Sequence, residues 1–329
     1  MRIAAVTVNW NQPRLTQLCV ESLVAGSCFP DWVIVIDNGS ALDPTTLVHL
    51  AYPHAVVLRN QANAGFAAAA NQGTERALAL GADAVLIVNN DAVVHRDCVA
   101  ELIAALERDT SLAGAGAKTL TQEQPPRIHT AYGMLTYHGQ LVRQQGWLEP
   151  DITQFNEQVL VDYISGCAML LRRTALERIG LLDAEFFAYH EDLDWCTRAR
   201  RAGYNVAYVP RAIVYHQMHA STGGGGYLSP ITYLSARNAI LFMRKNAGWT
   251  QWLTYAFYLC GNLLKEAVFR GRRGELAGFK LRLRGLRDGL LRRPVPLRAI
   301  GLSDDPRAAH ASPAATTEAG PIEQRLRRG

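Results

Sequence analysis

A chain of 329 residues, of which 49% are hydrophobic, is long enough to bury a large core, and we expect one large domain with or without an appendage. The net charge is only +5, which argues against a general nucleic-acid-binding protein. The six cysteines show no CxxC spacing and are interpreted as reduced thiols. No secretory signal precedes the first predicted strand, so the expected location is cytoplasmic.

The first part of the chain alternates short apolar runs with segments of helical spacing. The apolar runs predict strands at residues 3–8, 32–36, 55–58, 84–88 and 112–120. The segments between them predict helices at residues 13–25, 67–80 and 97–108. This alternation predicts an α/β fold whose doubly wound, mostly parallel sheet is of the Rossmann type and is flanked by helices.

Polar and small residues follow several of these strands. Asp37 comes after the second strand, and Asn63, Gly65 and Asn71 come after the third. Because ligands of open α/β sheets bind outside the carboxyl ends of the strands, we predict a shared pocket in which Asp37 accepts a hydrogen bond from an imide or a ribose. Turn formation is the alternative role for each residue taken alone. No glycine-rich dinucleotide or P-loop signature accompanies the strands.

The run from Ala84 to Asp91 reads AVLIVNND, the pattern of a buried parallel strand that opens into a polar crevice. Asp91 follows Asn89 and Asn90, and oxygen ligands of this kind suit a hard divalent cation. The alternative is an Asx turn in which Asp91 only caps the next helix.

The middle of the chain is less regular. Residues 122–157 are rich in proline and glycine and predict short strands and loops. The apolar segment 159–171 is interrupted at Ser165 and Gly166, and a glycine at such a point indicates close backbone approach to a ligand. A short helix is predicted from Thr174 to Ile179.

Residues 186–204 read FFAYHEDLDWCTRARRAGY. Glu191, Asp192 and Asp194 stand at a predicted helix start, where the helix dipole favours carboxylates. Because three carboxylates exceed what one helix end needs, one of them is predicted to be the general base for a substrate hydroxyl. Trp195 would offer its flat apolar face to a sugar ring. The alternatives are that the acids only cap the helix and that Trp195 lies in the core.

Two short strands are predicted at 206–209 and 213–215, and the second ends at His216. His216 is interpreted as a third metal-site group, a phosphate-binding residue or a structural histidine. Four consecutive glycines within 221–226 predict a flexible hinge that closes over bound substrate.

The carboxyl-terminal part has a different character. Helices are predicted at 231–245 and 250–269, and the second is too short and too polar for a confident membrane span. Residues 276–291 alternate apolar and basic side chains at helical spacing, which predicts a basic amphipathic helix on an anionic membrane. A helix docked on the catalytic domain is the alternative. Residues 294–329 are predicted to be disordered.

We therefore divide the chain into a catalytic domain at 1–226, carboxyl-terminal helices with a membrane role at 227–293, and a tail at 294–329. Within the catalytic domain, residues 1–120 are the predicted nucleotide-binding half and residues 121–226 the acceptor half.

From Ile3 to about Asn246, the chain resembles the inverting family 2 glycosyltransferases of the GT-A fold, in the branch that contains rhamnosyltransferases of bacterial surface-polysaccharide synthesis. Five blocks in the family's order carry the resemblance: VTVNWNQPRLTQLCVESL; VIVIDNGS; NQANAGFAAAANQG; AVLIVNNDAVV with SGCAMLLRR; and FFAYHEDLDWCTRARRAGY with VYHQMHAS.

The resemblance implies a role for particular residues. The nucleotide sugar would be bound by eight of them, namely Val8, Asn9, Asp37, Asn63, Gly65, Asn71, Asn89 and Asn90. Asp91 ends the counterpart of the family's Asp-x-Asp element and would bind Mg²⁺ or Mn²⁺ at the donor diphosphate, with His216 close by. The usual first aspartate of that element is Asn89 here, which should weaken metal binding.

The same resemblance assigns the acceptor side. Asp192, next to Glu191, matches the catalytic base, and Trp195 and Gly166 would contact the acceptor. The implied reaction transfers a sugar, with L-rhamnose from dTDP-L-rhamnose as the leading donor, to a glycan or lipid-linked acceptor. The enzyme would be peripheral on the inner face of the cell membrane. Alternatives are a UDP-sugar-dependent transferase, a nucleotidyltransferase on a similar sheet, and a non-catalytic scaffold that binds nucleotide sugars.

Overall fold

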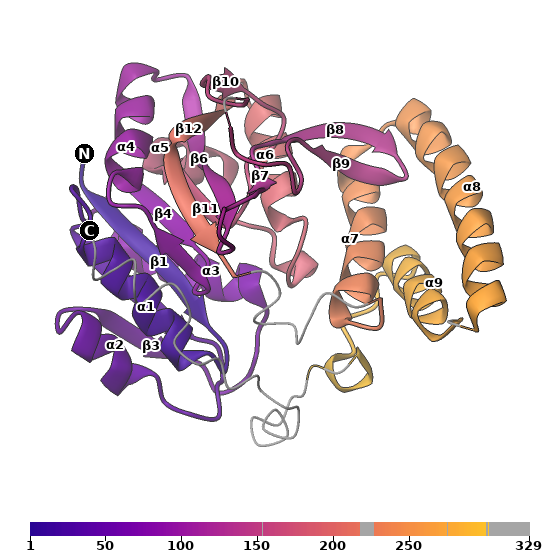
Figure 1. Cartoon of the computed structure of the whole chain (residues 1–329), viewed down its shortest axis with the longest axis horizontal. Coiled ribbons are helices and arrows are strands. Elements are labelled where there is room, and N and C mark those ends of the chain that lie inside the picture. The colour runs from indigo at the N-terminus through magenta and orange to yellow at the C-terminus, as the bar shows by residue number, and fades with distance from the viewer. Residues whose placement is uncertain (153, 218–226, 275, 301, 303–329) are drawn as a thin grey trace.

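The computed structural model describes residues 1–152, 154–217, 227–274, 276–300 and 302. Figure 1 shows a central sheet with helices on both faces and three helices carried on one side. The strands are β1 (Ile3–Asn9), β2 (Trp32–Asp37), β3 (Val56–Arg59), β4 (Ala84–Val88), β5 (Ala92–Val94), β6 (Leu112–Thr121), β7 (Ile128–Thr130), β8 (Gly133–His138), β9 (Gln140–Gln144), β10 (Val159–Leu160), β11 (Ala168–Arg172) and β12 (Asn205–His216). The helices are α1 (Pro13–Val24), α2 (Thr45–Ala51), α3 (Phe66–Ala79), α4 (Cys98–Arg108), α5 (Arg173–Ile179), α6 (Glu191–Arg201), α7 (Pro230–Asn246), α8 (Trp249–Arg273) and α9 (Leu276–Leu290), with short 3₁₀ turns η1 (Ala184–Phe186) and η2 (Leu297–Ile300).

The main sheet is mixed but mostly parallel along its central path. Its order is β10-β12-β6-β11-β4-β1-β2-β3, with β5 paired to β12 and β7 paired to β6. Strands β3, β2, β1 and β4 run parallel to one another, and β11 runs antiparallel between β4 and β6. Because β6 is thereby parallel to β4, and β12 is parallel to β6, the carboxyl ends of β1, β2, β4, β6 and β12 meet at one edge. The predicted α/β fold is confirmed.

The core lies on both faces of this sheet. β4 is buried at all five positions, as expected for a strand covered on both sides. Along β1, Ile3 and Ala5 belong to a buried cluster with residues of α1 and α4, whereas Ala4 and Val6 belong to a second cluster with residues of α3, α6 and α7. The alternation follows from the two-residue period of a strand. α3 approaches β1 so closely that a Cβ on Gly73 would lie 2.3 Å from a methyl carbon of Val6.

Two strand predictions need correction. The runs 206–209 and 213–215 belong to one strand, β12, because the ladder to β6 resumes at Ile213 after a bulge that leaves the residues between Val209 and Ile213 unpaired. β5 was not predicted, since its three residues lie directly behind the polar turn at Asp91. The predicted glycine hinge at 221–226 lies outside the described residues.

The carboxyl-terminal helices also differ from expectation. α7 contributes Ile240, Leu241 and Phe242 to the same buried cluster as the sheet, so the predicted boundary at residue 226 does not separate two cores. α9 packs on α7 through Gly285 and Gly289, where added Cβ atoms would lie 2.4 and 2.5 Å from backbone oxygens of α7. It is thus the docked helix that the sequence left as an alternative.

The tail prediction is wrong for its described part. Residues 297–300 form η2, and Ile300 and Leu302 are buried against Tyr233 and Leu234 of α7. Residue 301 and residues 303–329 lie outside the described part of the chain. Among the helices that the structure describes, none is long and apolar enough to cross a membrane.

Candidate active site

A cavity of about 480 Å³ opens at the edge of the sheet where the parallel strands end. Its walls come from the ends of β1, β4 and β12, the hairpin β8–β9, the start of α6 and one side of α7. Nine residues predicted from the sequence line it: Val8, Asn63, Asn89, Asn90, Asp91, Gly166, Glu191, Asp192 and His216. Of the four residues predicted to share a pocket after the second and third strands, namely Asp37, Asn63, Gly65 and Asn71, only Asn63 lines this cavity.

At one end of the cavity, Asp91 and His216 face each other. Asp91 Oδ1 lies 3.0 Å from His216 Nε2, and the amide nitrogen of Asn89 lies 3.5 Å from the same ring nitrogen. The tight turn from β4 into β5 brings this about, because β5 pairs antiparallel with β12 and sets His216 opposite Ala92. The β5–β12 pairing thereby brings His216 next to Asp91, although the two residues lie far apart in the sequence.

His129 of β7 was not identified from the sequence. Its Nδ1 lies 3.2 Å from His216 Nδ1, and the two rings stack with centroids 5.0 Å apart. The ring of Trp147 also contacts His129, with centroids 5.1 Å apart. Since the two ring nitrogens face each other, one must carry a hydrogen. The irregular segment 122–157 gave no periodic signal that could have placed His129 here.

At the other end of the cavity, the carboxylate of Asp192 is held by three donors. Its Oδ2 accepts from the Gly166 backbone N–H at 2.8 Å and from the Tyr163 hydroxyl at 2.9 Å, and its Oδ1 accepts from the Leu193 N–H at 2.8 Å. Burial raises the pKa of Asp192 above its usual value, while these hydrogen bonds oppose the rise. Burial also raises the pKa of Tyr163, which keeps its hydroxyl proton available for donation.

Glu191 is a different kind of carboxyl group. It is buried, and its Oε2 has no hydrogen-bond partner among the described residues. Burial and then the neighbouring charge of Asp192 raise the pKa of Glu191 well above the ordinary range. Of the adjacent pair, Asp192 is therefore the better anion, since it has the donors, and Glu191 is the better neutral acid.

The segment that leads into α6 has an unusual backbone. Phe187, Tyr189 and His190 have φ angles of 65°, 70° and 71°, a region that side-chain-bearing residues rarely occupy. Asn238 of α7 holds this segment, because its buried Nδ2 donates to the carbonyls of Phe186, Ala188 and Tyr189 at 2.7–2.8 Å. Burial lowers the pKa of His190 to about 4, so the ring is neutral at physiological pH.

Several residues predicted to contact the nucleotide lie behind the cavity. Asp37 is fully buried, and its two oxygens accept from Asn9 Nδ2 at 2.8 Å and Arg59 Nε at 2.9 Å. Asn9 is also fully buried and donates to the hydroxyl of Ser40 as well. Their expected direct contacts are corrected to a supporting network, because packing of β1 against β2 pairs Asn9 with Asp37.

Asn71 and Gly65 likewise support the pocket from outside it. The Asn71 amide donates to the Leu182 carbonyl at 2.7 Å and accepts from the Leu182 N–H at 3.0 Å, which ties α3 to the segment before η1. Gly65 has φ 89°, and a Cβ there would lie 2.7 Å from the Phe187 carbonyl oxygen. It is required for close packing against the strained segment and is not part of the cavity lining.

The prediction that Trp195 is an acceptor platform is wrong. Its side chain is 0% exposed, and its indole N–H donates to the Gly180 carbonyl at 2.9 Å. Trp195 lies about one turn further along α6 than Asp192, and that turn carries it away from the crevice into the core. Aromatic side chains that do line the cavity include Trp10, which directly follows β1, and Trp147.

A mostly parallel sheet with a polar crevice at its carboxyl edge, an acidic turn after the fourth strand and a carboxylate at a helix start together define a glycosyltransferase of the GT-A fold. The chain belongs to the glycosyltransferase-like family 2, whose family model matches residues 1–228.

Its relatives and structural neighbours agree with this class. The chain is 27% identical over 246 residues to an N-acetylglucosaminyl-diphospho-decaprenol L-rhamnosyltransferase of Mycobacterium tuberculosis, a match that covers 67% of this chain and 77% of that one. It is 25% identical over 253 residues to the dTDP-rhamnosyl transferase RfbF of Shigella flexneri, covering 74% and 80%. The solved structure of a mannosyltransferase from Pyrobaculum calidifontis in complex with GDP-Man and Mn²⁺ superimposes with a TM-score of 0.53 at 15% identity, covering 99% of this chain and 83% of that one.

Proposed function

We propose that the protein is an inverting glycosyltransferase that moves L-rhamnose from dTDP-L-rhamnose to a hydroxyl of a glycan or lipid-linked acceptor in surface-polysaccharide synthesis. The observation that carries the proposal is the single cavity that joins the Asp91–His216 pair to the triply hydrogen-bonded Asp192. The names of the relatives from Mycobacterium tuberculosis and Shigella flexneri support rhamnose as the sugar.

In this reaction Asp192 acts as the general base. It takes the proton from the acceptor hydroxyl while that oxygen forms a bond to the anomeric carbon, and the bond from that carbon to the nucleoside diphosphate breaks on the opposite face. The configuration inverts because entry and departure occur on opposite faces. Glu191, held neutral beside Asp192, avoids a second buried negative charge and can donate to a substrate oxygen.

The donor end of the cavity fits a divalent cation. Among the described residues there is no cluster of three or more ionisable metal ligands, but Asp91 and His216 converge, and the Asn89 amide is adjacent. A carboxylate with an imidazole suits Mg²⁺ or Mn²⁺ when the donor diphosphate supplies further oxygens. The bound ion would neutralise charge on the leaving diphosphate. Val8, Asn63 and Asn90 line the same cavity and would contact the nucleotide sugar.

The exposed surface of helix α8 supports the proposal that the protein binds an anionic membrane surface. The outer face of α8 carries an exposed apolar stripe at helical spacing: Trp249, Leu253, Phe257, Cys260, Leu264 and Val268. Phe257 is 77% exposed and Leu253 63% exposed, and the helix ends in Arg270, Arg272 and Arg273. Apolar residues beside a basic helix end fit the boundary between headgroups and acyl chains. These features support the proposal of a peripheral position on the inner face of the membrane, which would bring the site near lipid-linked acceptors.

The proposal is tested with purified full-length protein, a lipid-linked acceptor and a panel of dTDP-L-rhamnose, UDP-sugars and GDP-mannose, with Mn²⁺ present. Transfer from dTDP-L-rhamnose with inversion at the anomeric carbon is expected. Transfer from a UDP-sugar instead would show that the donor is a UDP-sugar and not dTDP-L-rhamnose. Donor binding without transfer to any acceptor or water would indicate a scaffold, and release of pyrophosphate from a nucleoside triphosphate would indicate a nucleotidyltransferase.

A further inference from the structure

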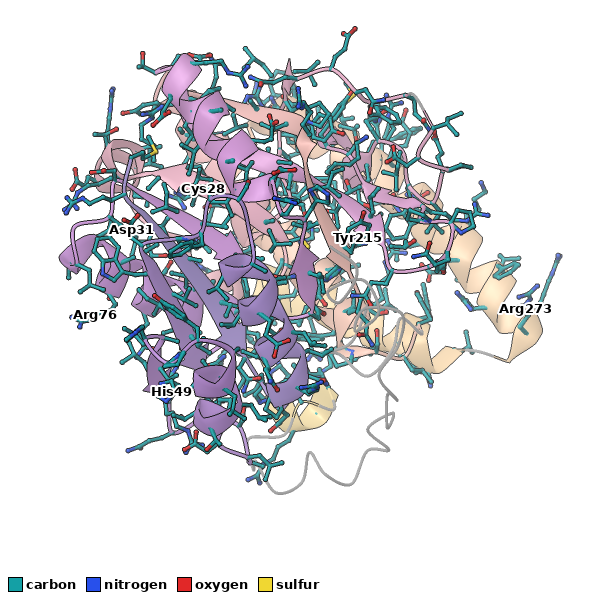
Figure 2. The ribbon with its side chains drawn as sticks, turned by 60° about the vertical axis from the view of Figure 1, so that its left-hand side comes forward. Cys28, Asp31, His49, Arg76, Tyr215 and Arg273 are labelled. Carbon is teal, nitrogen blue, oxygen red and sulfur yellow. The ribbon has the colours of Figure 1, made fainter. Side chains whose placement is uncertain are left out.

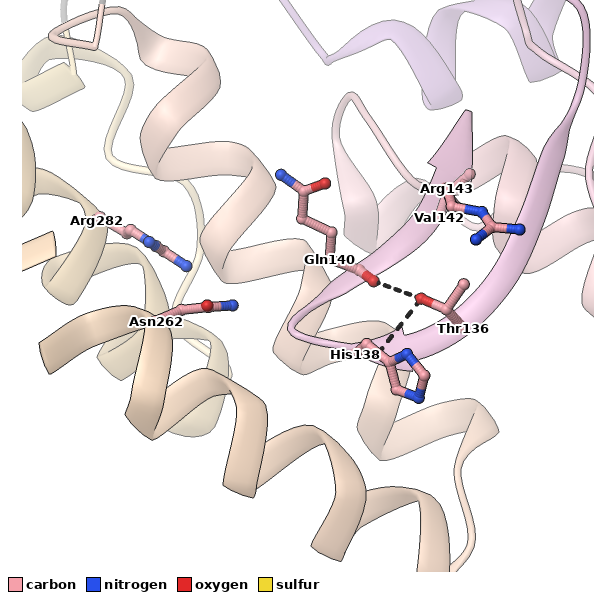
Figure 3. A pocket seen from close by; sticks show the side chains of 7 residues that line it. All are labelled: Thr136, His138, Gln140, Val142, Arg143, Asn262 and Arg282. Atoms are coloured by element: carbon pink, nitrogen blue, oxygen red, sulfur yellow. Dashed lines mark hydrogen bonds between the residues drawn. The ribbon is translucent and has the colours of Figure 1, made fainter. Parts of the chain in front are cut away.

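A second cavity lies outside the active site, between the β8–β9 hairpin and the carboxyl-terminal helices. It has a volume of about 430 Å³, and its lining is mostly polar: Thr136, His138, Gln140, Val142, Arg143, Asn262 and Arg282. Figure 3 shows Asn262 and Arg282 pointing from α8 and α9 towards the hairpin. We call it the hairpin pocket. No sequence-predicted site residue belongs to it.

The walls of the hairpin pocket are held in place by specific contacts. At the hairpin tip, Gly139 has φ 76°, and a Cβ there would lie 2.5 Å from the Asn262 amide nitrogen. The ring of His138 packs on Tyr258 of α8, with centroids 4.6 Å apart. Thr136 Oγ1 donates to the Gln140 carbonyl at 2.9 Å, as the dashed line in Figure 3 marks. Movement of the tip away from α8 would therefore break the His138–Tyr258 contact and the close approach of Gly139 to Asn262, whereas the Thr136–Gln140 hydrogen bond is internal to the hairpin.

The pocket presents positive charge and hydrogen-bond donors. Arg143 is exposed, and its Nη2 lies 3.8 Å from the thioether sulfur of Met134. Arg282 is fixed by an ion pair with Glu266, which uses one of its five N–H donors. The seven residues that line the pocket include no carboxylate. The guanidinium groups of Arg143 and Arg282 line the pocket together with amide and hydroxyl groups, and arginine binds phosphate oxygens in a bidentate manner.

The hairpin pocket adjoins the active-site cavity. Val142 lines both cavities, and Gln144, two residues further along β9, lines the active site. On its other side the pocket is bounded by α8, whose opposite face carries the apolar stripe. One helix diameter, about 10 Å, thus separates the pocket from the surface that we assign to the membrane.

We propose that the hairpin pocket binds the diphosphate of a lipid-linked acceptor, with the acceptor sugar reaching past Val142 towards Asp192 and the lipid passing over the edge of α8. The proposal rests on the proposed function for its acceptor class. It explains why a polar, basic pocket lies between the catalytic carboxylate and an apolar helix face.

Direct binding tests the site without any transfer reaction. The probe is geranyl diphosphate, titrated by calorimetry into the full-length protein with EDTA present, so that no divalent ion can hold a diphosphate at Asp91. We expect saturable binding that Arg143→Ala weakens about tenfold or more, as for loss of a charged hydrogen-bonding partner, and that Arg143→Lys weakens less. Arg76→Ala is the matched control, since Arg76 lies on the far side of the molecule from Arg273 of α8 in Figure 2 and should bind like the wild type.

Each competitor has a defined meaning. Competition by inorganic pyrophosphate supports the site and assigns its affinity to the diphosphate alone. Displacement by thymidine, uridine or guanosine, which carry no phosphate, would overturn the proposal, because the probe would then occupy the donor site. Displacement by phosphatidylglycerol vesicles would assign the arginines to bulk lipid headgroups and would also overturn it. If Arg143→Ala and the wild type bind geranyl diphosphate with equal affinity, the proposal is also overturned. A protein that binds the probe through Arg143 but transfers no rhamnose would keep this site and lose only the proposed function.

Discussion

Replacement of Tyr163 by phenylalanine isolates one hydrogen bond to the proposed base. The Tyr163 hydroxyl donates to Asp192 Oδ2 at 2.9 Å in a buried environment. The ring itself must remain, because it fills the space beside Gly133, where an added Cβ would lie 2.3 Å from Tyr163 Cδ1. Tyr163→Phe keeps the ring and removes only the donor.

The direction of the effect follows from the charge state of Asp192. The Tyr163 hydroxyl stabilises the carboxylate and so lowers the pKa of Asp192 against the effect of burial, and its loss raises that pKa. A base must be ionised to act, so the acid limb of the pH–rate profile moves to higher pH. A hydrogen bond to a charged group contributes about 1.5–3 kcal/mol, which corresponds to about a tenfold or larger loss of rate on the acid limb.

The assay is kcat/KM for sugar transfer across the pH range. Both enzymes should converge at high pH, where Asp192 is ionised in each. Tyr208→Phe is the matched control, since its hydroxyl donates to the Phe155 carbonyl at 2.8 Å in another cluster and should leave the limb unmoved. An acid limb that coincides in Tyr163→Phe and wild type, or a uniform loss of rate at all pH values, would refute the reasoning.

Three further predictions concern stability, positioning and the membrane. Because burial raises the folded-state pKa of Glu191, the stability of the wild type falls as pH rises through that pKa. Glu191→Gln should therefore raise Tm in alkaline solution, by about 2–4 °C for each kcal/mol of stability gained, and should leave Tm unchanged in acid. An increase in Tm that is largest in acid would contradict this reasoning. Asn238→Ala removes the three hydrogen bonds that hold the segment before Asp192, so kcat should fall about ten- to hundredfold. Donor affinity, measured by calorimetry, should stay unchanged. Equal changes in kcat and donor affinity would count against a positioning role for Asn238. Phe257→Glu on the stripe of α8 should abolish flotation with anionic liposomes but leave transfer to a water-soluble acceptor intact, whereas undiminished flotation would remove α8 from the membrane contact.

The sequence predicted the parts of the site that follow strand ends. Asp91 and His216 each terminate an apolar run, and parallel strands bring such ends to one edge, so their meeting could be anticipated. Gly166 was expected to allow close approach to a ligand, and its N–H approaches Asp192 itself. Periodicity identifies an element and its faces but not how deep each residue lies. Asn9 and Asp37 therefore turned out to bind each other beneath the cavity.

Other features depend on contacts between distant segments. Trp195 lies on the same helix as Asp192 but about one turn further along it, where its side chain is buried. No local sequence pattern distinguishes a buried tryptophan at this position from an exposed one. His129 lies in the three-residue strand β7, and Tyr163 follows the two-residue strand β10. Neither strand is long enough to show a two-residue period in the sequence. The docking of α9 on α7 depends on the close approach of Gly285 and Gly289 to α7. In the sequence these glycines could equally belong to the polar face of an amphipathic helix, and only the position of α7 shows that they form a contact.

Asp192→Asn tests the central claim most directly. The substitution keeps the size of the side chain and removes its basicity. Calorimetry with dTDP-L-rhamnose and Mn²⁺ should give wild-type affinity, while transfer to a lipid-linked acceptor falls about 10²–10⁴-fold, the contribution typical of a general base. Transfer within a few-fold of wild type would show that another group accepts the proton, and the assignment of Asp192 would be wrong.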